Sequence, residues 1–566
     1  MFLTATLKSR FGKPWPASLT ALLQMALLAL AAWLIWRNAW VSDDATITLR
    51  TVLNLLTGYG ARFNIDERVQ AYTHPLWFGL LALGTVIAGN AFLVAAWLGI
   101  GVSVAALAWL LRLAINPWQG LLAAAALLCS TAFMEFSTAG LENPLSHLLL
   151  LAAASTLIRI HDAPADAPLR ARSLRSFFLC AGLLYLSRPD LVLLLAPCAL
   201  QLLAARRIPV ATRAHALVWT AVPVLVWTAF SLLYYGFPFP NTAYAKLGTG
   251  IPHSQLLMQG LRYFGNTLMS NPIVVLALSP AVKIKYLGLS LSDPLTLAVT
   301  ALALLLAPWV RRWGWSWALG VALYLVYVVS IGGDFMAGRF FTAPMLAGAI
   351  VLARAQLPGA RVVPRLVLGL LTLAVPALAW HNIQNTVRTA MDGKLPYNWV
   401  LDIHLIADER SFYFARYALA NISASDLALF RPDSYRARGA VGATRIICGD
   451  LGHTGIQGGP GLHNIDTCAL ADPLLARLPI DFNHPSLRQM AGIPDPANEP
   501  KWRIGHFERA VPDGYVQSIE QNANLLTDPV LHACYERIRH ITRAPLLESQ
   551  RLRDIVRVNL AGAGCH

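Results

Sequence analysis

The sequence predicts a polytopic α-helical membrane protein that continues into a soluble domain, and three observations carry that prediction. The chain of 566 residues is 56% hydrophobic and only 13% charged, whereas a soluble protein carries roughly a quarter charged residues. Apolar runs of spanning or near-spanning length recur as far as residue 381. After about residue 383, charged residues, Pro, Gly and His become frequent and no such run remains. We therefore divide the chain into a membrane domain, residues 1–382, and a soluble domain, residues 383–566.

The basic residues predict the orientation of the membrane domain. The net charge of +15 comes largely from Lys and Arg in short loops between apolar runs, which sets topology and does not indicate nucleic-acid binding. Three of these cations precede the first apolar run, so the N-terminus should be cytoplasmic. That run ends in tryptophans and not in small residues, which favours an uncleaved anchor over a signal peptide. The expected spans lie near residues 17–36, 91–111, 117–133, 143–159, 176–187, 191–205, 215–235, 293–310, 315–331, 340–353 and 366–381.

Eleven spans place the soluble domain outside the cytoplasm, provided that the apolar segment Pro75–Ala88 is not a further full span. We assign this segment as an interfacial or re-entrant helix within the first outer loop, residues 37–90. A conventional hairpin of two spans is the alternative.

Cysteine usage agrees with an outer, oxidising location for the soluble domain. Three cysteines lie in predicted spans, whereas the tail holds an even set of four, as disulfide formation would require. Of the three possible connectivities we favour Cys448 with Cys468 and Cys534 with Cys565. The spacing also permits a zinc site, whose four ligands would be Cys448, His453, His463 and Cys468.

Unusual polar clusters interrupt the apolar region, and under this topology all of them fall on the outer side. Ionisable groups at membrane depth cost several kcal/mol unless they are paired or line a polar cavity. One shared outer cavity would accommodate them all. The clusters are Asp43 with Asp44, His74, Glu135 with Glu142, Arg188 with Asp190, Asn241 with Lys246, and Asp334 with Arg339.

The cavity would combine carboxylates with cations, and this mixture indicates a class of chemistry. Arg can bind a phosphate through two hydrogen bonds, Lys adds a point charge, and a carboxylate can accept the proton of an attacking hydroxyl. Asp43 and Asp44 are the strongest candidates, because adjacent like charges repel and an N-cap would use only one of them. A helix that begins at either residue would put both acids at its positive end. The other pairs, taken singly, could equally be structural ion pairs.

The residues around these clusters resemble, in the same order, the motifs of bacterial GT-C glycosyltransferases. The likeness is to the mycobacterial terminal arabinofuranosyltransferase and its proteobacterial relatives, which include pilin arabinosyltransferases. It covers nearly the whole chain, although Gln70 and His74 stand where Glu and a small polar residue are expected. The matching runs are residues 43–50, 54–64, 67–77, 137–142, 188–190, 234–236, 240–246 and 332–336 with Arg339, and in the tail 503–509 and 511–515.

This resemblance implies a GT-C fold of about eleven transmembrane helices in the bacterial inner membrane, with a C-terminal periplasmic mixed α/β domain. It implies transfer of arabinofuranose from a decaprenyl- or undecaprenyl-phosphate donor to a glycan or pilin acceptor at a site facing the periplasm. No cofactor is demanded by the spacing, although hard carboxylates could hold a divalent cation at Asp43 or Asp44 with Asp190. The implied roles are catalysis for Asp43 and Asp44, donor phosphate binding for Arg188, Lys246 and Arg339, and substrate binding or support for His74, Glu142, Asp190, Asn241 and Asp334.

Other functions stay open at this stage. One is a non-catalytic GT-C-like assembly factor, for instance in flagellar motor control, and another is a GT-C enzyme that transfers mannose or aminoarabinose. A lipid or ion transporter is disfavoured, because no inverted repeat is visible and the charges gather on one side. In the soluble domain, the Gly-rich segment 449–461 lacks the ending of a P-loop. Its aromatic residues Trp502, Phe507 and Tyr515 could be sugar platforms, with core packing as the favoured alternative.

Overall fold

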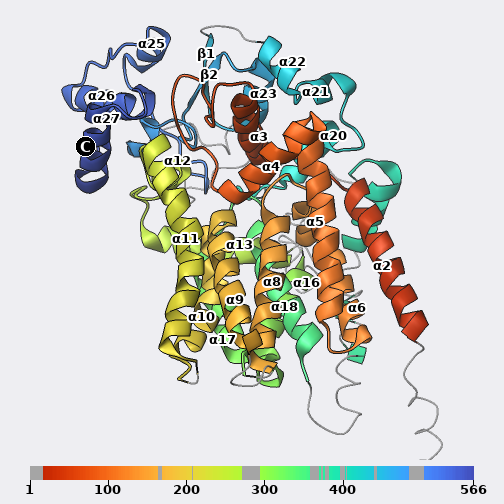
Figure 1. The fold of residues 1–566 in the computed structure, drawn as a ribbon. Coiled ribbons are helices and arrows are strands. Elements are labelled where there is room, and N and C mark those ends of the chain that lie inside the picture. The colour runs from red at the N-terminus through yellow and green to blue at the C-terminus, as the bar shows by residue number, and fades with distance from the viewer. Residues whose placement is uncertain are drawn as a thin grey trace, which may run out of the picture.

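The computed structural model describes residues 17–162, 168–206, 208–269, 293–310, 312–356, 369–370, 374–375, 382–395, 402, 404–438, 443–482 and 502–565. Figure 1 shows two layers. Long apolar helices run side by side in the lower part of the view, and the C-terminal residues, in blue, gather at one end of them. Helices α3 (Asp43–Leu56) and α4 (Pro75–Ala88) lie between the two layers.

The described residues include four helices that are long and apolar enough to cross a membrane, so the chain is a mostly helical, multi-pass membrane protein. The exact count of eleven spans and the orientation stay predictions, and the expected span 366–381 lies largely outside the described residues. The four helices are α2 (Ala17–Arg37), α5 (Ala91–Leu113), α8 (Asn143–Asp162) and α11 (Val210–Tyr234). The other helices of this layer are α6 (Pro117–Leu128), α7 (Thr131–Phe136), α9 (Pro168–Ser187), α10 (Val192–Ala204), α12 (Asn241–Lys246), α13 (His253–Met269), α16 (Pro294–Leu305), α17 (Gly314–Ser330) and α18 (Thr342–Arg354), with 3-10 turns η1 (Pro189–Leu191), η2 (Ala307–Trp309) and η3 (Arg339–Phe341).

One predicted span is broken in the structure. The apolar run 117–133 forms α6 and then a separate short helix α7, because the Ser130 hydroxyl caps α7 by accepting a hydrogen bond from the Phe133 amide at 3.0 Å. Ser130 also donates to the Asp293 carboxylate at 2.6 Å. Apolarity alone does not reveal such a cap, since the run on both sides of Ser130 is hydrophobic.

Arg354 joins three helices at the end of the bundle that lies away from the C-terminal layer. The Arg354 guanidinium donates to the Leu113 carbonyl oxygen at 3.2 Å and lies 3.8 Å from the Asp162 carboxylate. These contacts join the last turns of α18, α5 and α8.

The C-terminal layer combines short helices with a two-stranded parallel sheet. Strands β1 (Ala443–Ile447) and β2 (Leu462–Asp466) pair from Ala443 opposite Leu462 to Ile447 opposite Asp466, and α23 (Leu451–Gly458) connects them. Disulfides join Cys448 to Cys468 and Cys534 to Cys565. The remaining elements are α20 (Glu409–Tyr417), α21 (Ala424–Ala428), α22 (Pro432–Ala437), η4 (Leu475–Arg477), α25 (Tyr515–Glu520), α26 (Pro529–Arg543) and α27 (Ser549–Ala561).

Two sequence-based alternatives for this layer are not realised. Trp502, Phe507 and Tyr515 are buried in the core, so they are not exposed platforms for a sugar. The zinc set is not assembled either, because two of its cysteines form a disulfide and its two histidines pair with different acids.

Candidate active site

The site begins at the first turn of α3, where the helix starts at Asp43 as expected. Ser42 caps it: the Ser42 hydroxyl accepts a hydrogen bond from the Ala45 amide at 3.2 Å and donates to the Ala139 carbonyl oxygen at 3.0 Å. Because a serine fills the cap position, neither aspartate is used for capping. Both carboxylates therefore lie in the first turn, where the helix dipole favours negative charge.

Helix α23 of the C-terminal layer crosses α3 at very short range. A Cβ atom on Gly452 would lie 2.2 Å from the Thr46 hydroxyl, and one on Gly455 would lie 2.5 Å from an Arg50 nitrogen. Only glycine permits this approach, because any side chain would collide with α3. The Gly-rich segment thus forms the contact between α23 and α3, and this contact places the residue beside Gly452 next to the aspartate pair.

His453, which lies beside Gly452 on α23, holds Asp43. One carboxylate oxygen, Oδ1, accepts hydrogen bonds from the His453 backbone amide at 2.8 Å and from Nδ1 of its ring at 3.0 Å. The buried ring packs against both Tyr417 and Tyr413, with centroid distances of 3.8 and 4.9 Å. Burial alone would lower the pKa of His453, but its hydrogen bonds to Asp43 and Asp450 raise the pKa above the usual value.

Asp44 has different surroundings from its neighbour. Its side chain is 25% exposed, and Nη1 of Arg339 lies 3.6 Å from its carboxylate. Among the described residues, no hydrogen bond uses this carboxylate. Burial raises the pKa of Asp44, and the positive charges of Arg339 and Lys246 oppose that rise. Asp44 is therefore the acid of the pair that is open to another molecule.

A buried carboxylate, Glu142, connects most of the predicted site residues. It lies 3.1 Å from Nδ1 of His74, 3.3 Å from Nη2 of Arg339 and 3.6 Å from Nε of Arg188. Burial alone would raise the pKa of Glu142. Its interactions with Arg339, His74 and Arg188 instead hold this pKa below its usual range. The other ring nitrogen of His74 lies 3.0 Å from the Thr48 hydroxyl on α3. Glu142 thus fixes the positions of two arginines and one histidine.

The two arginines differ in which carboxylates they contact besides Glu142. Arg188 is held by Asp190 at 2.7 Å and stacks on the Phe340 ring at 4.8 Å. Arg339 spans Glu142 and Asp44, with Asp334 at 3.9 Å. Of these two arginines, Arg339 is the one that contacts the aspartate pair.

Lys246 and Asn241 lie at opposite ends of the short helix α12 and have different environments. Lys246 is exposed, and its Nζ lies 3.7 Å from where a Cβ of Gly505 would be. Within the described part of the chain it has neither a hydrogen bond nor an ion pair. Asn241 does not join the cluster: its amide donates to the carbonyl oxygens of Ala469 and Asp472, both at 2.9 Å, and so ties α12 to the C-terminal layer.

Two further residues near the cluster were not predicted. Glu409, at the start of α20, lies 3.6 Å from Arg503, and burial raises the pKa of Glu409 to about 8. The negative charges of Asp44 and Asp43 add to that rise. The second residue is His453, which the sequence had suggested only as a zinc ligand. The only signal for Arg503 was its place in a tail motif, 503–509, that matched the resemblance.

Three side chains could hold a divalent cation. Asp43, Asp450 and His453 each offer one ligand atom, and these atoms lie within 4.8 Å of one another. An imidazole with two carboxylates suits Zn²⁺ or Mn²⁺. A proton on Nδ1 of His453 satisfies the same atoms by hydrogen bonding. Asp190, which the sequence had suggested as a partner for such an ion, instead pairs with Arg188.

Comparisons with known proteins confirm the expected sequence likeness. The terminal beta-(1->2)-arabinofuranosyltransferase of Mycobacterium tuberculosis is 30% identical over 348 residues, which cover 56% of this chain and 53% of that protein. The protein of the same name from Corynebacterium glutamicum is 28% identical over 421 residues, 68% of this chain and 56% of that protein. The chain thus spans about half the length of these curated relatives. No protein-family model matches it.

Solved structures give a weaker likeness. The archaeal oligosaccharyltransferase AglB of Archaeoglobus fulgidus, solved with an inhibitory peptide and a dolichol-phosphate, has a TM-score of 0.44 at 14% identity, covering 80% of this chain and 65% of that one. ArnT from Cupriavidus metallidurans, solved with undecaprenyl phosphate, has a TM-score of 0.29 at 12% identity, covering 80% and 90%. Scores in this range do not by themselves establish a shared fold.

Proposed function

We propose that the protein is a membrane glycosyltransferase that moves a sugar, arabinofuranose, from a polyprenyl-phosphate donor to a hydroxyl of a periplasmic glycan or protein. The observation that carries the proposal is the unequal pair of aspartates close to Lys246, which has neither a hydrogen bond nor an ion pair among the described residues. The sequence likeness to arabinofuranosyltransferases supports the choice of sugar.

Asp44 is the base in this proposal. Its carboxylate is partly exposed and lacks a hydrogen-bond donor among the described residues, whereas Asp43 already accepts two N–H bonds from His453. A raised pKa also makes Asp44 a better proton acceptor than an ordinary aspartate. Asp44 therefore orients the acceptor hydroxyl and takes its proton, and Asp43 positions the first turn of α3.

Lys246 and Arg339 bind the donor phosphate. Lys246 is exposed and has no ion pair among the described residues, and Arg339 already contacts Asp44, so a phosphate between them would lie beside the base. When the bond from the sugar to the phosphate breaks, the same two cations stabilise the negative charge that develops on polyprenyl phosphate. Arg188 acts one step further away, through Glu142, and does not itself bind the phosphate.

The proposal is tested with membranes that contain the Asp44→Asn protein, a lipid-linked arabinofuranose donor and an extracted cell-envelope acceptor. We expect pentose transfer to fall about 10²- to 10⁴-fold, the range that general-base catalysis contributes. Asp513→Asn, which changes an exposed aspartate of the tail, is the matched control and should leave transfer unchanged. Near-normal transfer in both Asp43→Asn and Asp44→Asn would instead support a non-catalytic assembly role.

A further inference from the structure

The hairpin of α26 and α27 leaves one apolar face of α27 uncovered. Arg551, Ile555 and Val558 on this helix are buried against its neighbours. Leu552, Val556 and Leu560 are 38%, 59% and 84% exposed, and they are spaced four residues apart. Residues with this spacing lie along one side of a helix, so they form a continuous row, here called the α27 stripe.

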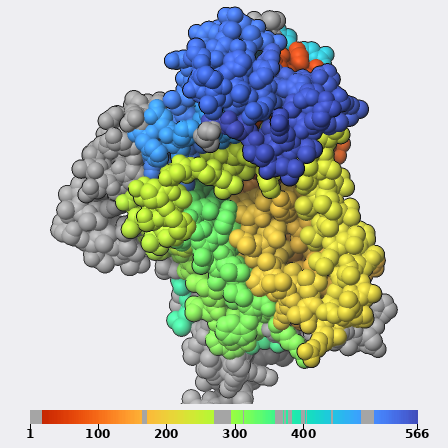
Figure 2. All heavy atoms as spheres, turned by 90° about the vertical axis from the view of Figure 1, so that its left-hand side faces the viewer, coloured from red at the N-terminus to blue at the C-terminus, as the bar shows by residue number. Residues whose placement is uncertain are grey.

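The α27 stripe lies next to the end of a membrane helix. The Arg551 guanidinium donates to the carbonyl oxygens of Leu233 at 2.9 Å and Tyr234 at 3.1 Å, the last two residues of α11. Figure 1 shows α27 beside the upper end of α11, and in Figure 2 the dark blue C-terminal atoms rest directly on the yellow atoms of that region. Because α11 is long and apolar enough to cross a bilayer, its end marks the level of the membrane surface.

The orientation of the α27 stripe follows from its neighbours around the helix. Asn559 donates to the Gly236 carbonyl oxygen at 2.8 Å, so Asn559 and Arg551 together mark the side of α27 that faces the end of α11. At 100° per residue, Leu552 and Val556 come next to Asn559 around the helix, followed by Leu560. Apolar surface is exposed on α11 as well, at Leu233 in its last turn, which is 44% exposed.

Cations flank the α27 stripe on its other side. Arg553 and Arg557 are exposed and lie one turn apart, directly beyond Leu560 around the helix. An apolar row with arginines along its margin is the pattern of helices that lie in the headgroup region of a membrane, where the cations meet anionic lipids.

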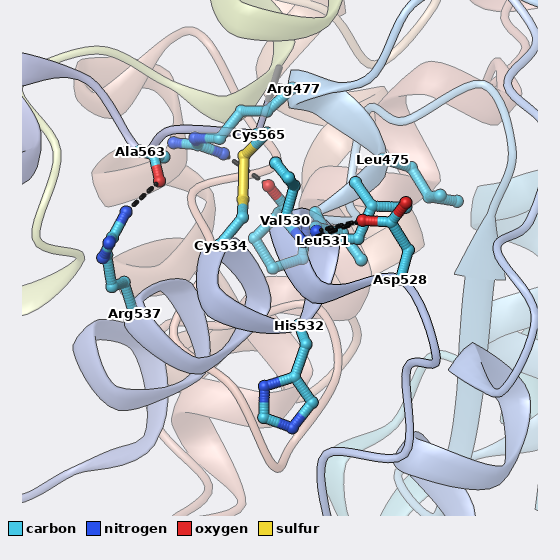
Figure 3. The surroundings of a disulfide bond; sticks show 12 residues. Leu475, Arg477, Asp528, Val530, Leu531, His532, Cys534, Arg537, Ala563 and Cys565 are labelled. Carbon is cyan, nitrogen blue, oxygen red and sulfur yellow. Dashed lines mark hydrogen bonds between the residues drawn. A yellow bond between two sulfur atoms is a disulfide. The ribbon is translucent and has the colours of Figure 1, made fainter.

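The hairpin is fixed in this arrangement at both ends of α27. The disulfide between Cys534 and Cys565 ties the residues after α27 back to α26, and the Arg537 guanidinium donates to the Ala563 carbonyl oxygen at 3.0 Å (Figure 3). At the other end, Nε2 of His540 lies 3.4 Å from the Glu548 carboxylate, and Nδ1 of the same ring lies 2.7 Å from the Asp554 carboxylate in the middle of the helix. The α27 stripe cannot turn inward without breaking these links.

We infer that α27 is an interfacial anchor: its apolar stripe enters the outer leaflet beside α11, and Arg553 and Arg557 contact anionic headgroups. The anchor ties the C-terminal layer to the lipid surface and so sets the height of α12 and α23 above it. This inference does not depend on the proposed sugar transfer.

The test uses the full-length protein in lipid nanodiscs, with Cys129, Cys180 and Cys198 changed to Ala. A nitroxide is attached to Val556→Cys or Leu560→Cys, and its collision rates with oxygen and with a water-soluble nickel chelate are measured. We expect both labels to favour oxygen, at about 5–10 Å below the headgroups. Gln550→Cys, on the water-facing side of the same helix, is the matched control and should favour the chelate. Equal chelate accessibility at all three positions would overturn the inference.

A second arm varies the charge and tests for another occupant. The label at residue 556 should be less accessible to the nickel chelate in nanodiscs of phosphatidylglycerol than in nanodiscs of phosphatidylcholine. Arg553→Gln with Arg557→Gln should remove that difference. Equal accessibility of the label to the chelate in all of these cases would contradict the role of the arginines. Dipolar broadening between two labels at residue 560, in place of lipid protection, would assign the α27 stripe to a second copy of the chain and overturn the inference.

Discussion

Asp43 and Asp44 are neighbours in the chain but have separate tasks in the structure. Two adjacent carboxylates would repel each other, and His453 relieves this by donating two hydrogen bonds to one of them. The other is left with Arg339 at 3.6 Å. His453 thus holds one acid, and the carboxylate of the second stays partly exposed.

His453→Ala should separate this positioning role from a structural one. We expect kcat for sugar transfer to fall about 10- to 100-fold, as is typical when an orienting partner is lost, with KM for the lipid donor unchanged. His453→Gln, which can still donate a hydrogen bond, should recover part of the rate. His532→Ala, an exposed histidine, is the control. A normal kcat in His453→Ala would show that Asp43 needs no orientation.

Glu409 should make stability depend on pH. The folded state raises its pKa from the usual 4.5 to about 8, so the folded protein binds this proton more tightly than the unfolded chain does. The contribution of Glu409 to stability is therefore full below about pH 4.5 and is lost as the pH rises towards 8, by at most about 1.4 kcal/mol per pH unit. Thermal unfolding of Glu409→Gln between these pH values should show a flatter profile, and parallel profiles would contradict the assignment.

At the scale of elements, the site depends on the crossing of α3 and α23. Gly452 and Gly455 allow α23 to approach α3 so closely that backbone and side-chain atoms of the two helices touch directly. The crossing places His453 on one side of Asp43 and leaves Asp44 facing Arg339. A change that separates the two helices would remove the histidine from the site without altering any charged residue.

Gly452→Ala should therefore impair both stability and activity. The new Cβ would lie 2.2 Å from the Thr46 hydroxyl and 2.3 Å from the Asp43 carbonyl oxygen, so the helices must separate. We expect a loss of about 1–3 kcal/mol, as for overpacking, and a loss of transfer like that of His453→Ala. Gly101→Ala, in α5 with nothing within 4 Å of its Cβ position, is the control and should be neutral or slightly stabilising. Wild-type melting temperature and activity in Gly452→Ala would disprove the close crossing.

Local signals predicted some of these elements well. The helix of residues 75–88 has the expected bounds, because Pro75 begins it and Gly89 ends it in a left-handed conformation. The start of α3 was also visible, since acidic residues favour the first turn. The contacts of His453 and Glu409 could not be predicted, because no local periodicity relates residues several hundred positions apart. The Gly-rich segment was recognised only as not being a P-loop, since its use as a contact surface exists only in the folded chain.

At the scale of the whole molecule, the candidate site and the C-terminal layer lie at the same end of the helix bundle. The short loops predicted to face the cytoplasm carry Lys and Arg, so the positive-inside rule predicts an orientation with the site outside the cytoplasm.

The orientation is tested with reporter fusions. Alkaline phosphatase, which is active only after export, should be active when fused after residue 566, and a fluorescent protein that matures only in the cytoplasm should be dark there. A fusion between Arg206 and Arg213, a predicted cytoplasmic loop, should give the opposite pattern. Cytoplasmic signals at both positions would reverse the predicted topology.

The bond between Asp43 and His453 joins residues 410 positions apart. During synthesis the aspartate pair therefore reaches the membrane long before its histidine has been translated. Under the predicted orientation, the site can be completed only after every intervening helix has been inserted and the tail has been exported and folded. The proposed activity would in this way be coupled to the end of biogenesis, so a truncated or mistranslocated chain would carry the acids but lack the histidine that contacts them.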